Sequence, residues 1–522
     1  MLTYPLTIVF MPQPINRQLL ISQSYHNDLP NLHLPTPEQL DYPERIIQFG
    51  SGALLRGLVD FFVDRANQQG TFRGRAVIVN NTRSGRGALF NEQDGLFTLC
   101  VEGFADGETQ KDYLVISSVS RALPAIDHWP EVLKCAANPD ITVAVSNTTE
   151  IGITLHEDDD LSAHPPQSFP GKLTAYLHER FRQLGGTADT GMVILPTELI
   201  IDNGSKLRDI VLRLAEINQL SEAFVAWVRE HNTFCNTLVD RIVPGEPDEE
   251  KQRAIEEALG YQDGLLTVSE IYRFLAIQGD PESLYRRVPF LKTDPGIVIA
   301  EDITPYRERK LRILNGGHTI SVAAGFLSGL ETVYDCMEDE VLSAFIQQVI
   351  REEIVPSLEI DATMAQEFAE DVLDRFRNPF LNHRLISITL QYTSKMNMRN
   401  GLTFRRYYDK FGKVPERMCA GFAAYLLFTR PVREQGDTYY GEFRGNSYPI
   451  RDDQAAFFYE QWQGVDPSEE VAVEAFVREV LSHNTFWDQD LLNLGNFRER
   501  VTHYLVQFGQ RGVKDTLKEL PQ

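Results

Sequence analysis

Residues 45–64 read RIIQFGSGALLRGLVDFFVD, and this stretch indicates the fold of the first half of the chain. A short apolar run with β character (45–49) leads into Gly-Ser-Gly, and apolar residues at helical spacing follow at Leu54, Leu58, Phe61 and Phe62. Three further β-branched runs occur at 76–80, 141–146 and 191–195. Such runs are typical of buried strands in a largely parallel sheet. The pattern predicts an α/β domain of the Rossmann type.

The second half of the chain has a different pattern. After IVIA (297–300) the strand signals largely stop, and helical spacing is expected near 338–352, 365–376, 415–429, 468–482 and 488–508. Residues 1–40 contain six prolines and no glycine, which suggests an extended segment. We therefore expect an extended N-terminal arm (1–44), a Rossmann-type nucleotide-binding domain (45–298) and a mostly α-helical substrate and catalytic domain (299–522).

Composition limits the possible partners and the compartment. A net charge of −24 over 522 residues leaves no basic field for nucleic acid. No run of about 18 apolar residues predicts a membrane span, and the first residues lack the basic region of a signal peptide. The five cysteines are scattered without metal-ligand spacing, which suits a reducing cytoplasm. We expect a cytoplasmic protein that uses no metal. Neither H-E-x-x-H nor G-x-S-x-G occurs, so hydrolysis by zinc or by a serine nucleophile has no support in the sequence.

The segment FGSGALLR (49–56) is the candidate nucleotide loop, because Gly50 and Gly52 would let the backbone turn tightly and approach a pyrophosphate. The third position of the usual G-x-G-x-x-G is Leu55, so the fingerprint is incomplete. We expect the cofactor contacts to come from this loop and from SNTTE (146–150) at a later strand end, where α/β sheets bind ligands. The candidates are Phe49, Gly50, Ser51, Gly52, Leu55, Arg56, Asn147 and Glu150. Turn capping would explain the Ser, Asn and Thr residues of the second segment equally well.

The second predicted strand ends in Asn80-Asn81, where many NAD enzymes have an acid that binds ribose hydroxyls. Arg83 and Arg86 follow, and they could hold the 2′-phosphate of NADP or lie on a solvent-exposed loop.

Residues 308–318, ERKLRILNGGH, place three chemically useful side chains on one predicted helix. At about 100° per residue, Asn315 lies roughly 140° and His318 roughly 80° around the axis from Lys310. Polar groups on an otherwise apolar face must find partners or do chemistry. A buried histidine beside a snorkelling lysine is an equally good structural explanation.

Other charged residues occur in apolar surroundings. Asp240 and Arg241 in FCNTLVDRIVP (234–244) could form a buried ion pair or bind a ligand. Arg375, Arg377 and Lys395 add positive charge to the second half, although most residues of this kind are surface charge.

Together these pieces resemble the long-chain polyol dehydrogenases typified by mannitol 2-dehydrogenase, from about residue 45 to about residue 500. The specific motifs are V-D-R-I-x-P (239–244) and K-L-R-x-L-N-x-x-H (310–318), with QDGLFTL (93–99) as a third landmark. The segments IIQFGSGALLRGLVDFFVD (46–64), SNTTE, TELIIDNG (197–204) and ITPYRERKLRILNGGHT (303–319) are more similar still to the branch of the family that reduces uronates.

The resemblance implies a metal-independent hydride transfer with NAD, with Lys310 as acid/base and Asn315 and His318 binding and polarising the reacting oxygen. The residue chemistry is compatible with these roles, because a desolvated lysine can both donate and accept a proton and an amide can donate to an alkoxide. The chain departs from the neutral-polyol members in two places. Leu199 replaces an asparagine, for which Asn203 is a possible substitute, and Arg307 stands where a glutamate is usual. Ala53-Leu54 also replaces the branch's usual Asn-Phe within the glycine loop.

A base in place of an acid favours a substrate with a carboxylate. The resemblance therefore implies reduction of D-tagaturonate to D-altronate by NADH in hexuronate breakdown, with Asp240, Asn203, Arg307 and Lys395 as the expected substrate-binding residues. Lys395 is the first candidate for the carboxylate. Reduction of fructuronate, oxidation of a neutral polyol and a catalytically silent nucleotide-binding protein remain as alternatives. The expected partner is a small sugar acid, and the chain is expected to be a monomer or a small homo-oligomer.

Overall fold

The computed structural model describes residues 13–22, 25–80, 86–105, 107–149 and 151–520. The chain divides into two compact units, of which the first comprises residues 1–102 and 109–303 and the second comprises residues 103–108 and 304–522. Among the described residues, no helix combines the length and the apolar character that crossing a bilayer requires.

Unit 1 is built on a six-stranded sheet in which every described pairing is parallel. Its order is β6 (Val119–Pro124), β3 (Arg75–Asn80), β2 (Glu44–Phe49), β7 (Val143–Ser146), β8 (Val193–Pro196) and β9 (Thr233–Phe234). Counting these strands along the chain gives the order 3-2-1-4-5-6, which is that of the dinucleotide-binding Rossmann fold. The predicted fold class is confirmed, and the four strands expected from β-branched runs correspond to β2, β3, β7 and β8.

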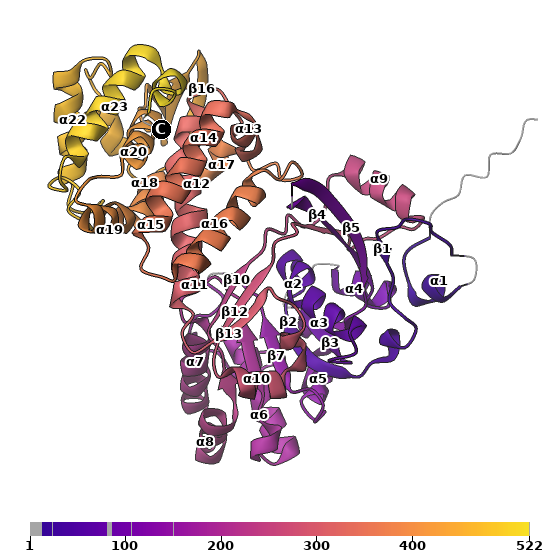
Figure 1. Cartoon of the computed structure of the whole chain (residues 1–522). Coiled ribbons are helices and arrows are strands. Elements are labelled where there is room, and N and C mark those ends of the chain that lie inside the picture. Colours follow the sequence, from indigo (N-terminus) through magenta and orange to yellow (C-terminus); the bar gives the residue numbers. More distant parts are fainter. Residues whose placement is uncertain (1–12, 23–24, 81–85, 106, 150, 521–522) are drawn as a thin grey trace, which may run out of the picture. The chain divides into compact units, whose positions relative to one another are not determined.

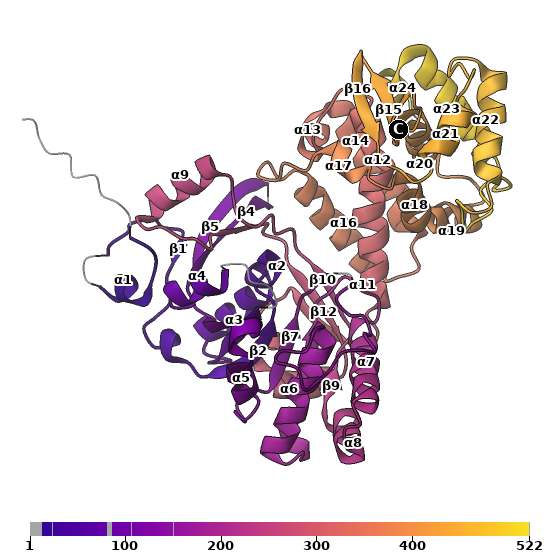
Figure 2. The same cartoon turned by 180° about the vertical axis from the view of Figure 1, so that it is seen from behind.

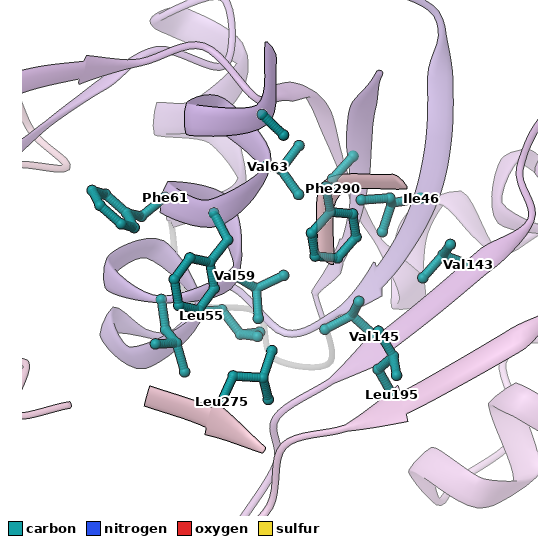
Figure 3. Packing of buried hydrophobic residues seen from close by; sticks show 14 of the residues in the cluster. Ile46, Leu55, Val59, Phe61, Val63, Val143, Val145, Leu195, Leu275 and Phe290 are labelled. Atoms are coloured by element: carbon teal, nitrogen blue, oxygen red, sulfur yellow. The ribbon is translucent and has the colours of Figure 1, made fainter. Parts of the chain in front are cut away.

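The apolar runs of these strands are explained by burial on both faces of the sheet. Ile46, Ile78 and Val145 belong to a core on one face, and Ile47, Val79 and Ala144 belong to a core on the other. The first face is covered by α2 (Ala53–Gly57) and α3 (Val59–Gln68), whose apolar side chains meet those of the strands in one layer, with Leu275 and Phe290 (Figure 3). The second face packs against α5 (Ala125–Cys135), α6 (Phe169–Leu184), α7 (Asn203–Ile217) and α8 (Glu222–His231).

Two smaller sheets complete unit 1. One has the order β1 (Leu32–His33), β5 (Glu108–Ile116), β4 (Phe97–Ala105) and β11 (Thr267–Ser269), and the other has the order β10 (Thr237–Asp240), β12 (Phe274–Gln278) and β13 (Ile297–Ala300). In both views α9 (Glu249–Leu259) lies beside β4 and β5 (Figures 1 and 2). The remaining helical segments are α1 (Arg17–Ile21), α4 (Arg86–Glu92), α10 (Pro281–Arg287) and the short 3₁₀ turns η1 (Gln39–Asp41), η2 (Ala188–Thr190) and η3 (Pro289–Lys292).

The expected N-terminal arm differs in the structure. Over its described residues, the segment 1–44 is part of unit 1, because Ile15 and Leu40 are buried in a core with Tyr261 and Leu259. Ile15 N donates to Gln262 O at 2.8 Å, and β1 pairs with β5. The scarcity of charge in this segment therefore reflects packing of its apolar residues.

Unit 2 is mostly helical, as expected. Its first elements run without interruption from α11 (Thr304–Arg309) through the π-helical segment η4 (Lys310–Gly316) to α12 (Gly317–Phe326). All residues of α12 from Gly317 to Gly325 are buried, so this helix is the centre of the unit (Figure 1).

The other helical segments of unit 2 are α13 (Val333–Glu338), α14 (Glu340–Gln348), η5 (Val349–Ile354), α15 (Val355–Ser357), α16 (Ala362–Phe376), α17 (Leu385–Ile388), α18 (Tyr392–Met396), η6 (Asn397–Gly401), α19 (Leu402–Phe411), α20 (Glu416–Phe428), α21 (Ala455–Gln461), α22 (Glu470–Ser482), α23 (Phe497–Arg511) and α24 (Val513–Leu517). The antiparallel sheet β14 (Arg433–Gln435), β15 (Thr438–Phe443) and β16 (Asn446–Ile450) has no counterpart in the sequence expectations.

Candidate active site

The glycine loop of unit 1 lies where the strand order of the large sheet reverses. β2 pairs with both β3 and β7, so the loops after β2 and β7 leave the same edge of the sheet side by side. Gly50 has φ +125°, and a Cβ at this position would lie 2.9 Å from the carbonyl oxygen of Asn147. Only glycine fits this close approach. Phe49 and Leu55 are both fully buried and anchor the two ends of the loop in the core.

The glycine at position 52 is not explained by backbone conformation, unlike that at position 50. Its φ is −66°, which any residue adopts, and a Cβ there would meet no atom within 4 Å. Neither backbone conformation nor packing inside the protein therefore requires glycine. The open space above its Cα is what the close approach of a pyrophosphate to this loop would need.

The loop is supported from below by Arg56, whose side chain is completely buried. Arg56 Nε donates to Thr267 Oγ1 at 2.7 Å, and Nη1 donates to the carbonyl of Ser51 at 3.0 Å. Arg56 thus fixes the path of the loop. Asn80, at the end of β3, donates to Ser51 Oγ at 3.2 Å, while its Oδ1 is buried without a hydrogen-bond partner. A ribose hydroxyl would satisfy this acceptor, so the residues present fit a bound dinucleotide.

The loop after β7 is held by Glu198, which lies at the end of β8. Its carboxylate accepts from Thr148 N at 2.9 Å and from Ser146 Oγ at 3.2 Å. Burial raises the pKa of Glu198. Asn147 Nδ2 donates to Thr197 O at 2.9 Å, so part of the capping explanation for SNTTE holds for its described residues. Glu150 and Arg83 lie outside the described residues, whereas Arg86 forms an ion pair with Glu246 at 2.8 Å.

A buried carboxyl group lies behind the same loop. Gln48 Nε2 donates to Gly50 O at 3.3 Å and to Asp60 Oδ2 at 3.4 Å, while Gln48 Oε1 and Asp60 Oδ1 are buried without partners. Burial raises the pKa of Asp60 to about 7. A protonated Asp60 would be able to donate to Gln48, which an ionised one cannot do.

We expect Asp60→Asn to stabilise the protein at alkaline pH. Burial makes the pKa of Asp60 about 7 in the folded protein, against an ordinary value of 3.8. The contribution of Asp60 to the free energy of unfolding is therefore full below pH 3.8, and it is lost as the pH rises through about 7. At pH 8.5 the variant should unfold with a free energy about 4 kcal/mol above that of the wild type, at about 1.4 kcal/mol per pKa unit. Urea unfolding at pH 5 and 8.5 measures the difference. Asp41→Asn is the contrast, because the Arg17 guanidinium, 2.6 Å away, holds the pKa of the exposed Asp41 carboxyl below its usual value, so removing this charge should give no gain in stability at pH 8.5. Equal curves for wild type and Asp60→Asn at both pH values would contradict this account.

Asn203 is a structural residue, which corrects its expected role in binding substrate. Its amide nitrogen donates to the carbonyls of Pro196 (3.0 Å) and Glu198 (3.1 Å) and to Thr237 Oγ1, and its oxygen accepts from Gly204 N and Thr237 N, both at 2.9 Å. The side chain is completely buried. No hydrogen-bonding capacity remains for a ligand, and Leu199, which is 61% exposed, offers none.

Asn203→Ala should therefore lower stability and leave substrate affinity unchanged. The substitution leaves several buried backbone groups without partners, which costs about 3 kcal/mol. Thermal unfolding measures the loss. Asn493→Ala is the matched control, since this exposed amide bonds only to Asp490 among the contacts described. A higher KM for the substrate at unchanged melting temperature would restore Asn203 as a ligand.

The segment around Asp240 is also tightly packed. Asp240 ends β10 opposite Phe274 and is 6% exposed. The next residue, Arg241, donates to Glu270 O at 2.8 Å through Nη2 and to Gly57 O through Nη1, and its guanidinium lies 4.7 Å from the ring centroid of Phe61. Arg241 thus links the end of α2 to the residue that follows β11. The binding role of Asp240 stays a prediction.

In unit 2, the helix carrying Lys310, Asn315 and His318 is not a regular α-helix. It is π-helical over Lys310–Gly316 and becomes α-helical at Gly317. Because π turns close from residue i to residue i+5, Asn315 follows Lys310 by about one turn and comes onto its face, where an α-helix would separate the two. π-helical segments often occur at functional sites. The local geometry thus brings together the two side chains nearest the expected chemistry.

His318 lies among aromatic and basic side chains. Its ring stacks on Phe376 with centroids 4.1 Å apart and meets His383 edge-on at 4.9 Å. Burial holds the pKa of His318 well below its usual range, and the charges of His383, Arg375 and Arg399 act in the same direction. The imidazole is therefore neutral near neutral pH and suited to hydrogen bonding with a reacting oxygen.

The predicted basic residues of unit 2 have different surroundings. Arg375 is buried and acts on both His318 and His383, whereas Arg377 forms an ion pair with Asp374 at 3.1 Å. Arg307 is half-buried on α11. Lys395, on α18, donates to Ile388 O at 3.1 Å, and burial followed by the charge of Arg399 lowers its pKa.

Sequence reasoning missed Arg399 and Thr319, which lie beside His318. Arg399 Nη1 donates to Thr319 Oγ1 at 3.0 Å. Thr319 directly follows the K-L-R-x-L-N-x-x-H motif, but no sequence signal connects it with a residue 80 positions away.

A cavity of about 560 Å³ in unit 2 contains none of the predicted site residues. It is lined by Glu352, Glu353, Tyr407, Lys413, Val414, Glu416, Arg417 and Asn496. Glu353 accepts from Arg417 N and Met418 N, both at 2.8 Å, and so caps the first turn of α20. Helix capping thus explains the buried carboxylate of Glu353 in this cavity.

Comparison with known proteins shows which protein family has these two domains. Residues 44–285 match the family model of the mannitol dehydrogenase Rossmann domain, and residues 302–508 match that of the mannitol dehydrogenase C-terminal domain. The chain is 38% identical to an altronate oxidoreductase of Bacillus subtilis (strain 168), across 92% of this chain and 95% of the relative. The chain belongs to the mannitol dehydrogenase family. It is accordingly an oxidoreductase with a Rossmann domain and a helical C-terminal domain.

A further relative and two solved structures are similar to this chain over nearly its full length. An altronate oxidoreductase of Pectobacterium carotovorum subsp. carotovorum (strain PC1) is 40% identical, across 91% of this chain and 96% of its own length. Among solved structures, a D-sorbitol dehydrogenase in substrate-free form has a TM-score of 0.75 at 22% identity, covering 97% of this chain and 100% of that one. The ternary complex of Pseudomonas fluorescens mannitol 2-dehydrogenase with NAD and D-mannitol has a TM-score of 0.66 at 23% identity, covering 97% and 99%. At these identities the two structures support the fold.

Proposed function

We propose that this member of the mannitol dehydrogenase family catalyses the reversible reduction of D-tagaturonate to D-altronate by NADH. The observation that carries the proposal is the match at 38–40% identity, over nearly the full length, to several relatives named altronate oxidoreductase. The electropositive surroundings of His318 support an anionic substrate, since the chain as a whole carries a net charge of −24.

Unit 1 would hold the dinucleotide. Gly50 and Gly52 give its pyrophosphate access to the backbone, with the loop fixed by Arg56, and Asn80 Oδ1 offers an acceptor to a ribose hydroxyl. When bound, the reduced nicotinamide supplies the hydride that converts the ketone to an alkoxide.

Unit 2 would supply the proton and the polar contacts to the reacting oxygen. Lys310 donates a proton to the alkoxide oxygen as the secondary alcohol forms, and it accepts that proton in the reverse direction. Asn315 and neutral His318 donate hydrogen bonds to the same oxygen without changing charge. One ketone, one reduced nicotinamide and one proton would give one alcohol and one oxidised nicotinamide, so the step balances without a further reactant.

The proposal is tested in the oxidative direction, where the product is unambiguous. Purified protein with D-altronate and NAD⁺ should generate NADH, followed at 340 nm, and the sugar product should be D-tagaturonate by NMR. D-Mannonate, the product expected of a fructuronate reductase, is the comparison for the first alternative. Faster oxidation of D-mannonate or D-mannitol than of D-altronate would overturn the assignment. A protein that binds NADH but oxidises none of the three would favour the catalytically silent alternative.

A further inference from the structure

Arg399 is held against the helix that carries Lys310, Asn315 and His318. It lies in the π-helical segment η6, and Arg312 Nη1 donates to the carbonyls of Met398 (2.7 Å) and Arg399 (3.1 Å). Asn400 Nδ2 donates to Gly316 O at 3.4 Å. Two π-helical segments are thus fastened together by hydrogen bonds, and the position of the Arg399 backbone relative to His318 is fixed.

Among the described residues, the Arg399 side chain forms one hydrogen bond and keeps spare donors. Nη1 donates to Thr319 Oγ1 at 3.0 Å, and Thr319 is itself buried and accepts from Tyr392 OH at 2.8 Å through its carbonyl. Nε of Arg399 is buried without a hydrogen-bond partner. In the described part of the chain, no ion pair of a carboxylate with this guanidinium is observed, and burial alone lowers the pKa of Arg399. A partly buried cation without a counter-ion is costly unless an anion joins it.

The surroundings add positive charge to the same place. Arg375 and Arg399 both act on His318, whereas burial and Arg375 lower the pKa of His383 and so keep it neutral. Arg399 also acts on Lys395, where Asp452 acts in the opposite sense. This concentration of basic groups contrasts with the excess of acidic over basic residues in the chain, 74 against 50. A guanidinium presents a planar fork of donors that matches the two oxygens of a carboxylate.

We propose that Arg399, steadied by Thr319, binds the carboxylate of the substrate and thereby selects sugar acids over the corresponding neutral ketoses. This inference rests on the proposed function and names the residue that makes the substrate class specific. Lys395, the first candidate from sequence, has a secondary role, because one of its donors is used by Ile388 O and its ammonium is a point charge.

The test compares two ketoses that differ at one end only. D-Tagaturonate carries a carboxylate where D-tagatose carries a primary alcohol, so their ratio of kcat/KM measures recognition of the carboxylate. Arg399→Gln should raise KM for D-tagaturonate on the order of a hundredfold, which is the scale of losing one partner of a charge pair. The kcat/KM for D-tagatose should change less than about threefold. Arg399→Lys should recover part of the loss, and Thr319→Val should raise KM for D-tagaturonate by about threefold to tenfold through looser positioning.

The matched control is Arg405→Gln in the following helix, α19. Arg405 is exposed and forms an ion pair with Asp409 at 2.9 Å, so its removal should leave both substrates unaffected. Thermal unfolding of each variant separates a general loss of structure from a change in selectivity. If Arg399→Gln lowered kcat/KM for both ketoses equally, or left their ratio intact, Arg399 would not be the carboxylate site, although the proposed function would stand.

A binding measurement separates failure of this inference from failure of the proposed function. Calorimetric titration of D-altronate into protein saturated with NADH, a pair that cannot react with each other, should show binding to the wild type and a loss on the order of a hundredfold in Arg399→Gln. If the wild type bound D-altronate through Arg399 but did not oxidise it, the anion site would stand and the proposed reaction would fall. If the wild type did not bind D-altronate, or Arg399→Gln bound it equally well, the inference would be overturned.

Discussion

Lys310→Ala should lower kcat for ketone reduction by about 10² to 10⁴, which is the range attributed to a well-placed general acid. Burial and neighbouring positive charge hold the pKa of His318 well below its usual range, so His318 stays neutral and Lys310 is the proposed acid of the Lys310, Asn315 and His318 set. NADH affinity should be unchanged, because Lys310 belongs to unit 2 and the glycine loop belongs to unit 1. Stopped-flow measurement of NADH oxidation at saturating substrate gives kcat, and fluorescence titration gives the NADH dissociation constant.

Two controls make this result specific. Added methylamine should restore part of the activity of Lys310→Ala, because a free amine can replace the missing acid. Lys410→Ala should keep full activity, since Lys410 is exposed and donates to Pro356 O at 2.8 Å. Activity of Lys310→Ala within tenfold of the wild type, with no response to amines, would remove the acid/base role.

Gly52→Val should weaken NADH binding on the order of a hundredfold while leaving the protein as stable as the wild type. An added Cβ meets nothing within 4 Å and the backbone has an ordinary φ of −66°, so the folded apoprotein has no reason to change. A pyrophosphate that approaches the loop would lose its closest backbone contacts, and about 3 kcal/mol corresponds to a hundredfold in the dissociation constant. Fluorescence titration with NADH and thermal unfolding of the apoprotein measure the two quantities.

Gly50→Ala provides the contrast. Its φ of +125° and the 2.9 Å approach of the Asn147 carbonyl make alanine strained at that position, at a cost of about 1–3 kcal/mol. That variant should therefore lose stability together with NADH affinity. If Gly52→Val bound NADH as tightly as the wild type, the dinucleotide would have to be held elsewhere.

Much of the fold could be predicted from the sequence because burial leaves a direct record in it. β2, β3, β7 and β8 are covered on both faces, so each reads as an unbroken apolar run. Segments that are buried by residues far away in the sequence show no such apolar run. Ile15 is buried by residues near position 260, and the sheet β14–β16 has few buried residues, so neither had a readable pattern.

The candidate site was predicted unevenly for the same reason. The glycine loop and the lysine helix are contiguous motifs, so their residues could be named in advance. Asn203 was misjudged because its partners Thr237 and Pro196 come from other strands, and only their geometry shows that the amide is fully used. The π-helical turn after Arg309 and the contact of Arg399 with Thr319 depend on packing between helices that no local spacing specifies.

The most direct test of the central claim is the ratio of kcat/KM for D-tagaturonate to that for D-fructose, measured with NADH on the wild-type protein. A neutral ketose offers nothing to the basic groups around His318, whereas a uronate offers its carboxylate. We expect a ratio on the order of a hundred or more, as for a site that loses a charged hydrogen-bond partner. A ratio near one or below it would contradict the account.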